Sequence, residues 1–269
     1  MERFETIVQT LEQRAQAVLS GWPPEWQGFH WPGYTYEHTL RVRNLAVAMA
    51  RQMGADNQVV EMAALLHDIG KPAGEPHGDI GAQRAQVILD ELGVDAGVRS
   101  CVCDLIRTHL APDPAYPVEN LALSDADYID ANFGYVAFTR YITIRAGRGT
   151  PVKGAISSAG DWLIRVSDRR QKVVTALGRS ITEERFARMA PLLDRLREGL
   201  RAETEQGKAA VEIARYLSAD AHRPSLLRQV KQMEQALQAE DGQRLDRLHP
   251  SPFLRHFVST LQEEISGQR

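Results

Sequence analysis

The sequence predicts an all-α fold. Apolar residues recur at helical spacing along nearly all of the 269 residues, and the period-two alternation that indicates β-strands is scarce. A helix-ending glycine followed by a helix-capping aspartate occurs twice, as Gly54 with Asp56 and as Gly93 with Asp95. Glycines and prolines between residues 70 and 76 break the chain after another apolar helical stretch. These observations favour a helical bundle with a helical extension at its C-terminal end.

The helices can be placed in chain order from their apolar spacing and their breaks. Residues 59–69 read VVEMAALLHDI and are apolar almost all round, so this stretch predicts a central helix. Two segments are expected to be irregular: the aromatic, proline-rich residues 21–37 and the glycine-containing residues 147–154. Helices are expected over 2–20, 38–54, 56–69, 79–93, 95–110, 118–132, 132–146, 154–178, 181–204, 207–217, 224–240 and 251–266.

Composition excludes several classes of protein. With 32 basic and 35 acidic residues the net charge is −3, so no global charge favours nucleic acid or a membrane surface. No apolar run reaches the length of a membrane span, and the charged start MERFETIVQTLEQRAQ does not resemble a signal peptide. The two cysteines, Cys101 and Cys103, would point apart on a helix, which favours free thiols and a cytoplasmic location. Self-association into a homo-oligomer stays open.

The strongest candidate for chemistry is the pair His67–Asp68 in Leu65-Leu66-His67-Asp68-Ile69-Gly70-Lys71. This pair ends the apolar helix where the glycine- and proline-rich break begins. A buried carboxylate is costly unless a cation or a full set of donors compensates it. A metal ion would supply that compensation.

Further histidines and acidic residues surround this pair in the sequence. His38 and His109 each lie on the apolar face of an expected helix, where a single histidine is more often a hydrogen-bonded core residue than a ligand. Their occurrence together with a His-Asp pair favours a metal centre. His77 lies in the break and would by itself be a loop histidine. Periodicity does not decide whether Asp125 or Asp127 faces such a site.

The ordered set His38, His67-Asp68 and Asp127, with LLHDIGK at its centre, resembles the HD-domain superfamily of metal-dependent phosphohydrolases. Within that superfamily it is most similar to uncharacterised bacterial HD hydrolases. The resemblance covers about residues 34–146 and implies an HD phosphohydrolase domain over 1–205. A change of composition near residue 205 then separates a C-terminal helical extension over 206–269.

The resemblance also implies a ligand set. Residues that match His38, His67, Asp68 and Asp127 hold the first metal in such proteins, and the aspartate of the pair bridges to a second. His77 and His109 match the histidines that hold the second ion. Asp127 is preferred over Asp125 because the carboxylate of the family follows an alanine, as in Ala126-Asp127.

Ligand chemistry and family resemblance together predict the activity. Imidazole and carboxylate ligands without a thiolate suit Mn²⁺, Fe²⁺, Mg²⁺, Co²⁺ or Zn²⁺, one or two per chain. The expected reaction is hydrolysis, by metal-activated water, of a phosphate mono- or diester of a nucleotide or another small phosphorylated metabolite. Asp68 and Lys71 are the candidate catalytic residues. The candidate substrate-binding residues are Arg41, Lys71, Arg145 and Lys153.

Alternatives accompany these assignments. Lys71 is equally compatible with a solvated cation at a helix C-terminus. Arg107-Thr108-His109-Leu110 lacks the paired histidines and Gly-Tyr-Pro signature of the cyclic-dinucleotide phosphodiesterases, so that substrate is not expected. A di-iron oxygenase could use the same ligands, and a non-catalytic module could use a metal only to brace its helices. Metal content, oxygen consumption and phosphate release distinguish the three.

Overall fold

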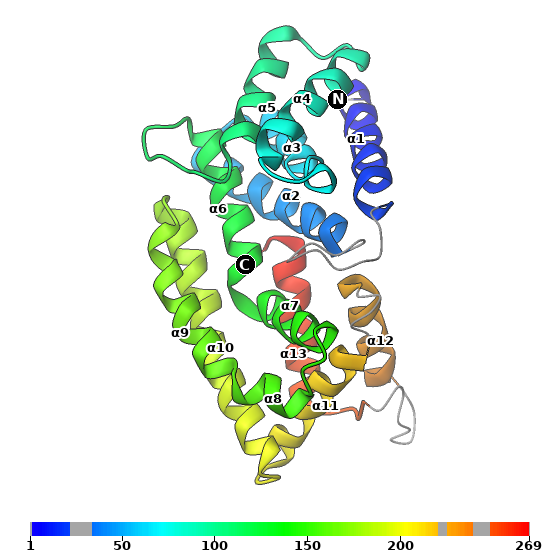
Figure 1. Cartoon of the computed structure of the whole chain (residues 1–269), viewed down its shortest axis with the longest axis vertical. Helices are drawn as coiled ribbons and strands as arrows, with labels where there is room; N and C mark the ends of the chain where they lie inside the picture. The colour runs from blue at the N-terminus through cyan, green and yellow to red at the C-terminus, as the bar shows by residue number, and fades with distance from the viewer. Residues whose placement is uncertain (1, 22–33, 220–224, 239–247, 269) are drawn as a thin grey trace. The chain divides into compact units, whose positions relative to one another are not determined.

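A computed structural model describes residues 2–21, 34–219, 225–238 and 248–268, and its regular elements are helices, which confirms the all-α class (Figure 1). Two compact units are present. The first consists mainly of residues up to Ile129 together with Val173–Arg179. The second consists mainly of Asp130–Lys172 and Ser180–Gly267. The sequence-predicted domain boundary near 205 coincides with no limit of these units and stays a prediction.

The first unit is built around a buried central helix, as predicted. Within α3 every residue from Val59 to Leu66 except Glu61 is buried, and the helix packs against α1, α2 and α5 (Figure 1). Asp56 caps its start by accepting the N–H groups of Gln58 and Val59. The helices of this unit are α1 (Glu2–Ser20), α2 (Tyr34–Met53), α3 (Asn57–Leu66), α4 (His77–Glu91), α5 (Ala96–Thr108) and most of α6 (Val118–Asn132).

The second unit has its own hydrophobic core. Phe257 stacks on Tyr135 at 4.9 Å between ring centroids and meets the edge of Phe138 at 6.3 Å. The buried carboxylate of Glu264 accepts the N–H groups of Tyr135 and Val136 at the start of α7. The remaining helices are α7 (Gly134–Gly147), α8 (Val152–Ser157), α9 (Ala159–Arg169), α10 (Ala176–Leu200, which begins in the first unit), α11 (Glu205–Ala219), α12 (Leu226–Gln238) and α13 (Pro252–Ser266).

Three predicted helix limits were wrong. Helix α2 begins at Tyr34, not at 38, and Tyr34 is buried. The single helix expected over 154–178 is α8 and α9 followed by a 3₁₀ turn, because the chain turns at Ser158, whose hydroxyl donates to the carbonyl of Gly154. Helix α10 starts at Ala176, not near 181, because the Thr175 hydroxyl accepts the N–H of Gly178 and caps it.

Other predictions can be compared with the described residues. The break expected over 147–154 separates α7 from α8. The aromatic segment predicted over 21–37 lies largely outside the described residues. Cys101 and Cys103 are free, as expected, with Cys103 buried. Among the described helices, none has both the length and the apolar character needed to cross a membrane.

Candidate metal centre

The first unit brings the six predicted metal ligands together from five helices. His38 comes from α2, His77 is the first residue of α4, and Asp127 comes from α6. The remaining three stand directly after helix ends: His67 and Asp68 follow α3, and His109 follows α5. Asp127 is partly buried and the other five residues are buried.

These side chains form three overlapping groups, in each of which the possible ligand atoms lie within 4.8 Å of one another. Asp68 is common to two of the groups, and His67 and His109 are each common to two as well. Asp127 belongs to one group. The groups are His38 with His67 and Asp68, His67 with His109 and Asp127, and Asp68 with His77 and His109.

Asp68 is the central carboxylate. Its Oδ1 lies 3.4 Å from Nε2 of His67 and 3.7 Å from Nε2 of His77. Its Oδ2 lies 3.8 Å from Nε2 of His38 and accepts a hydrogen bond of 2.5 Å from Nζ of Lys71. The two oxygens therefore face different histidines, an arrangement suited to a carboxylate that bridges two cations.

Asp127, the second carboxylate of the cluster, lies next to His38. Its Oδ1 lies 2.9 Å from Nε2 of His38 and 3.8 Å from Nε2 of His67. Asp125 has a different role, since its carboxylate accepts the N–H groups of Val174 and Thr175 at 2.9 and 2.8 Å. The geometry therefore places Asp127, the predicted carboxylate, with the histidines and uses Asp125 to hold the start of α10.

Hydrogen bonds at Nδ1 orient the histidine rings. Nδ1 of His67 lies 2.7 Å from the carbonyl oxygen of Ala64, and Nδ1 of His109 lies 2.6 Å from that of Ile106. Donation from Nδ1 to these carbonyls leaves the lone pair on Nε2, which is the atom turned toward the carboxylates. Both rings are thereby prepared as neutral ligands.

Unsatisfied atoms within the cluster fit a cation. Nε2 of His67, Nε2 of His109 and Oδ1 of Asp68 are buried and make no hydrogen bond to any described residue. An unsatisfied buried polar group costs about 1–3 kcal/mol. These atoms are two imidazole nitrogens and a carboxylate oxygen, the donors that first-row divalent metals prefer. The residues present therefore fit a divalent metal ion.

The protonation states also fit a metal. Burial lowers the pKa of His67 to about 4 and lowers that of His109 below its usual value, so both imidazoles are neutral at pH 7. Burial by itself would raise the pKa of Asp68, but His67, Lys71 and His38 outweigh it and bring the pKa below its usual range. Burial would also raise the pKa of Asp127, but its hydrogen bond with His38 and the neighbouring histidines together bring the pKa well below its usual value. Neutral imidazole and ionised carboxylate are the forms that bind metals.

Sequence reasoning missed two residues that shape this centre. Glu75 contacts Nδ1 of His77 through both carboxylate oxygens, at 3.0 and 2.9 Å. Gly70 lies so close to the next helix that a Cβ on it would stand 2.1 Å from the carbonyl oxygen of His77. Gly70 directly precedes Lys71, and Glu75 lies two residues before His77. No local sequence pattern predicts the contacts that these two residues make.

The predicted substrate-binding residues are placed in both units. Lys71 pairs with Asp68, and Arg41 is buried one helical turn beyond His38, with its guanidinium carbon 5.6 Å from the centroid of the Tyr34 ring. Arg145 and Lys153 belong to the second unit, where Nη2 of Arg145 lies 3.4 Å from the Ser158 hydroxyl. Their substrate contacts stay predictions.

The fold and the cluster define a helical protein with a histidine- and aspartate-lined candidate metal centre. The family comparison agrees with this description, because the model of the HD domain matches residues 35–132, a range that includes all six residues. Residues 35–132 of this chain are therefore similar to the HD domain. That finding confirms the resemblance seen in the motif.

Similar proteins cover only parts of the chain or differ widely in sequence. A deoxyguanosinetriphosphate triphosphohydrolase-like protein of Nitrobacter hamburgensis is 43% identical over 28% of this chain and 18% of its own length. Ribonuclease Y of Helicobacter hepaticus is 30% identical over 35% of this chain and 17% of its own. The symmetrical bis(5'-nucleosyl)-tetraphosphatase of Bacillus subtilis is 30% identical over 37% of this chain and 62% of its own. The chain thus spans less than a fifth of the first two relatives.

Solved structures support the fold. Bacillus subtilis YpgQ in complex with ADP has a TM-score of 0.57 at 21% identity, over 74% of this chain and 98% of its own. An HD-superfamily hydrolase of Bacillus thuringiensis has a TM-score of 0.56 at 19% identity, over 74% of this chain and 99% of its own. At these identities the similarity concerns the fold alone.

Proposed function

We propose that this chain is a metal-dependent phosphohydrolase that cleaves a phosphate ester of a nucleotide or of another small phosphorylated metabolite. One observation carries the proposal: a buried cluster of four histidines and two aspartates in which Nε2 of His67, Nε2 of His109 and Oδ1 of Asp68 lack hydrogen bonds among the described residues. Such a cluster is costly to bury unless a cation completes it.

The residues of the cluster would have separate roles in binding the metal and the phosphate. A bound divalent ion would lower the pKa of a water molecule from about 15.7 toward about 7 and so supply a nucleophile at neutral pH. His38, His67, Asp68 and Asp127 would hold a first ion, and Asp68, His77 and His109 would hold a second. Lys71, whose ammonium lies 2.5 Å from Oδ2 of Asp68, would donate to a phosphate oxygen.

The names of similar proteins support nucleotides as the substrate class. Two relatives are named for the hydrolysis of nucleoside polyphosphates, and one structure of similar fold was solved in complex with ADP. Two free cysteines fit a reducing compartment, so we place the reaction in the cytoplasm.

Phosphate release tests the proposal. The metal-free protein is incubated with Mn²⁺ and a panel of nucleoside mono-, di- and triphosphates, a dinucleoside tetraphosphate and bis(p-nitrophenyl) phosphate. We expect release from at least one compound that EDTA abolishes and that Asp68→Ala lowers by at least about 10²-fold. The matched control is Asp104→Ala, since the side chain of Asp104 is 63% exposed on α5 and should be dispensable.

Three results would contradict the proposal. Release that is equal in Asp68→Ala would place the chemistry elsewhere. Oxygen consumption by the iron-loaded protein without phosphate release would indicate an oxygenase. Full metal occupancy with no turnover across the panel would indicate a metal that only braces the helices.

A further inference from the structure

Among the three histidines whose Nδ1 contacts are described above, His77 differs in the partner that orients it. His67 and His109 are held by backbone carbonyls three residues earlier, inside the buried end of their own helix. His77 is held by a carboxylate, because both oxygens of Glu75 lie within 3.0 Å of its Nδ1. The orientation of His77 therefore depends on a side chain, which a substitution can remove.

Glu75 also fixes the main chain at the same point. Its Oε2 accepts the N–H of His77 at 3.0 Å, and His77 is the first residue of α4. One carboxylate thus holds both the backbone and the ring of His77. A carboxylate behind a ligating imidazole fixes the tautomer and makes the opposite nitrogen a better ligand.

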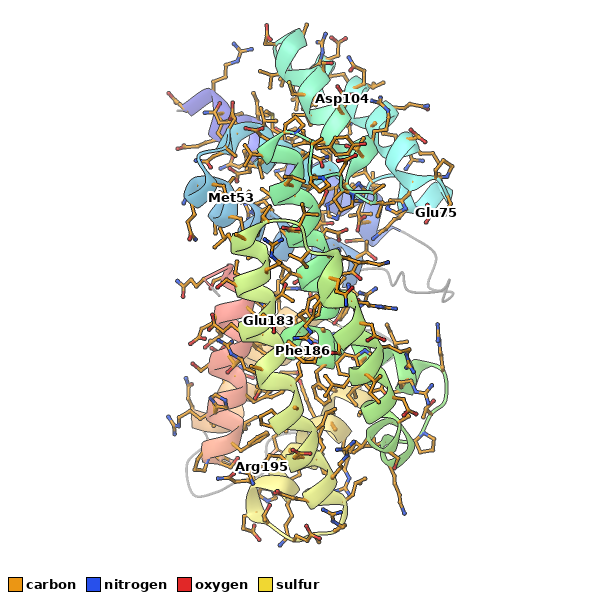
Figure 2. All side chains as sticks on the ribbon, turned by 90° about the vertical axis from the view of Figure 1, so that its left-hand side faces the viewer. Met53, Glu75, Asp104, Glu183, Phe186 and Arg195 are labelled. Carbon is orange, nitrogen blue, oxygen red and sulfur yellow. The ribbon has the colours of Figure 1, made fainter. Side chains whose placement is uncertain are left out.

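Glu75 combines this role with exposure to solvent. Its side chain is 68% exposed, whereas that of His77 is 5% exposed. Figure 2 shows Glu75 at the edge of the ribbon of the first unit, beside the start of α4. A residue at this position can be changed without creating a cavity in the core, so the effect of a substitution can be assigned to His77.

The histidine that Glu75 orients belongs to one of the three candidate groups only. His77 occurs with Asp68 and His109, and it is absent from the group of His38, His67 and Asp68 and from the group of His67, His109 and Asp127. Loss of the orientation of His77 should therefore weaken one cation position. The position formed by His38, His67 and Asp68 keeps all its ligands.

We propose that Glu75 is a positioning residue for the second cation, and that its removal converts a two-ion centre into a one-ion centre. The inference rests on the proposed metal-binding function and adds to it a residue outside the ligand set. Glu75 acts through His77 and is not itself a ligand. Replacement of such an orienting partner typically lowers metal affinity by about 10–100-fold.

Titration of the full-length protein with Mn²⁺ tests the proposal. Metal-free wild type, Glu75→Ala and Glu75→Gln are titrated by calorimetry, and bound Mn²⁺ is counted by mass spectrometry after buffer exchange. Paramagnetic resonance distinguishes a coupled pair of Mn²⁺ ions from a single ion. We expect two ions in wild type, one tight ion in Glu75→Ala with the second weakened by about 10–100-fold, and an intermediate second affinity in Glu75→Gln, which keeps an acceptor but loses the charge.

A matched control is available in the second unit. Glu212 contacts Nδ1 of His249 at 2.9 and 3.0 Å, as Glu75 contacts His77, but neither residue belongs to a candidate metal group. Glu212→Ala should bind two Mn²⁺ ions with the affinities of the wild type. An equal loss in this variant would show a general effect of removing a carboxylate and would overturn the proposal.

The outcomes separate this inference from the proposed function. If Glu75→Ala binds both ions as tightly as wild type, or if wild type binds one ion only, the role of Glu75 is refuted while metal-dependent hydrolysis stands. If wild type binds no Mn²⁺, the proposed function fails together with the inference. If Glu75→Ala loses both ions equally, Glu75 does not act selectively on the second position, and the inference is again refuted.

Discussion

Replacement of Gly70 by alanine should displace His77 and weaken the metal centre. The added Cβ would stand 2.1 Å from the carbonyl oxygen of His77 and 2.7 Å from the backbone nitrogen of Gly81, where ordinary contact begins at 3.4 Å. Both neighbours are backbone atoms at the start of α4, so the helix must move away by about 1 Å. The φ and ψ angles of Gly70 are −78° and −26°, which alanine adopts without strain, so the effect is steric.

The displacement of His77 should change the stability, the rate of phosphate release and the metal binding of the Gly70→Ala variant. Overpacking of this kind lowers the free energy of unfolding by about 1–3 kcal/mol, which denaturant titration of the metal-free protein measures. A displacement of about 1 Å at a catalytic constellation can cost about 10²-fold in rate, so phosphate release should fall by a similar factor. Mn²⁺ titration should show that the group of Asp68, His77 and His109 is the one weakened.

Gly81→Ala is the matched comparison on α4. Its Cβ would meet the Cγ2 methyl of Ile106 at 3.2 Å, a contact that a small side-chain shift relieves. We therefore expect little loss of stability and nearly normal Mn²⁺ binding. Unchanged stability and two bound ions in Gly70→Ala, or equal losses in both variants, would refute the steric argument.

Three further predictions concern the ligands, the metal and the second unit. Asp127→Asn should lower Mn²⁺ affinity by at least about 10-fold with little loss of stability. Asp125→Ala should leave Mn²⁺ binding intact and lower the free energy of unfolding by about 1–3 kcal/mol for each N–H of Val174 and Thr175 left without an acceptor. The reverse pattern in calorimetry and denaturant titration would contradict the assignment. Addition of Mn²⁺ at 100 times its Kd should raise the free energy of unfolding of the metal-free protein by about 2.7 kcal/mol, and an unchanged thermal transition would contradict metal binding to the folded state. Burial raises the pKa of Glu264, so above pH 4.5 the folded state keeps a proton that the unfolded chain has lost. The contribution of Glu264 to the free energy of unfolding is therefore full below its ordinary pKa of 4.5 and is lost as pH rises through the raised value. Denaturant titrations from pH 4.5 upward should therefore show the stability of wild type falling relative to Glu264→Gln, which cannot ionise, and a constant difference would refute the raised pKa.

Local sequence patterns were sufficient for the central part of the fold. The apolar stretch around α3 predicted a buried helix because burial on all sides requires apolar residues at every position. The same stretch ends at His67 and Asp68, so their place at the end of a core helix followed from the sequence. The family resemblance then added the order of the other ligands.

Tertiary contacts decided the features that the sequence did not predict. The early start of α10 depends on Asp125, which is 50 residues away from Thr175 in the chain. The orienting contact of Glu75 and the close approach at Gly70 depend on how the chain returns after the 3₁₀ turn Lys71–Ala73. Periodicity measures the burial of a helix face and carries no information about such single contacts.

Anomalous X-ray scattering from crystals grown with Mn²⁺ tests the metal centre most directly. Data collected on both sides of the manganese absorption edge would locate each ion independently of any assumed ligand set. We predict two peaks, one among His38, His67, Asp68 and Asp127 and the other among Asp68, His77 and His109. Absence of a peak within this cluster in crystals that contain Mn²⁺ would contradict the metal centre and the hydrolytic function built on it.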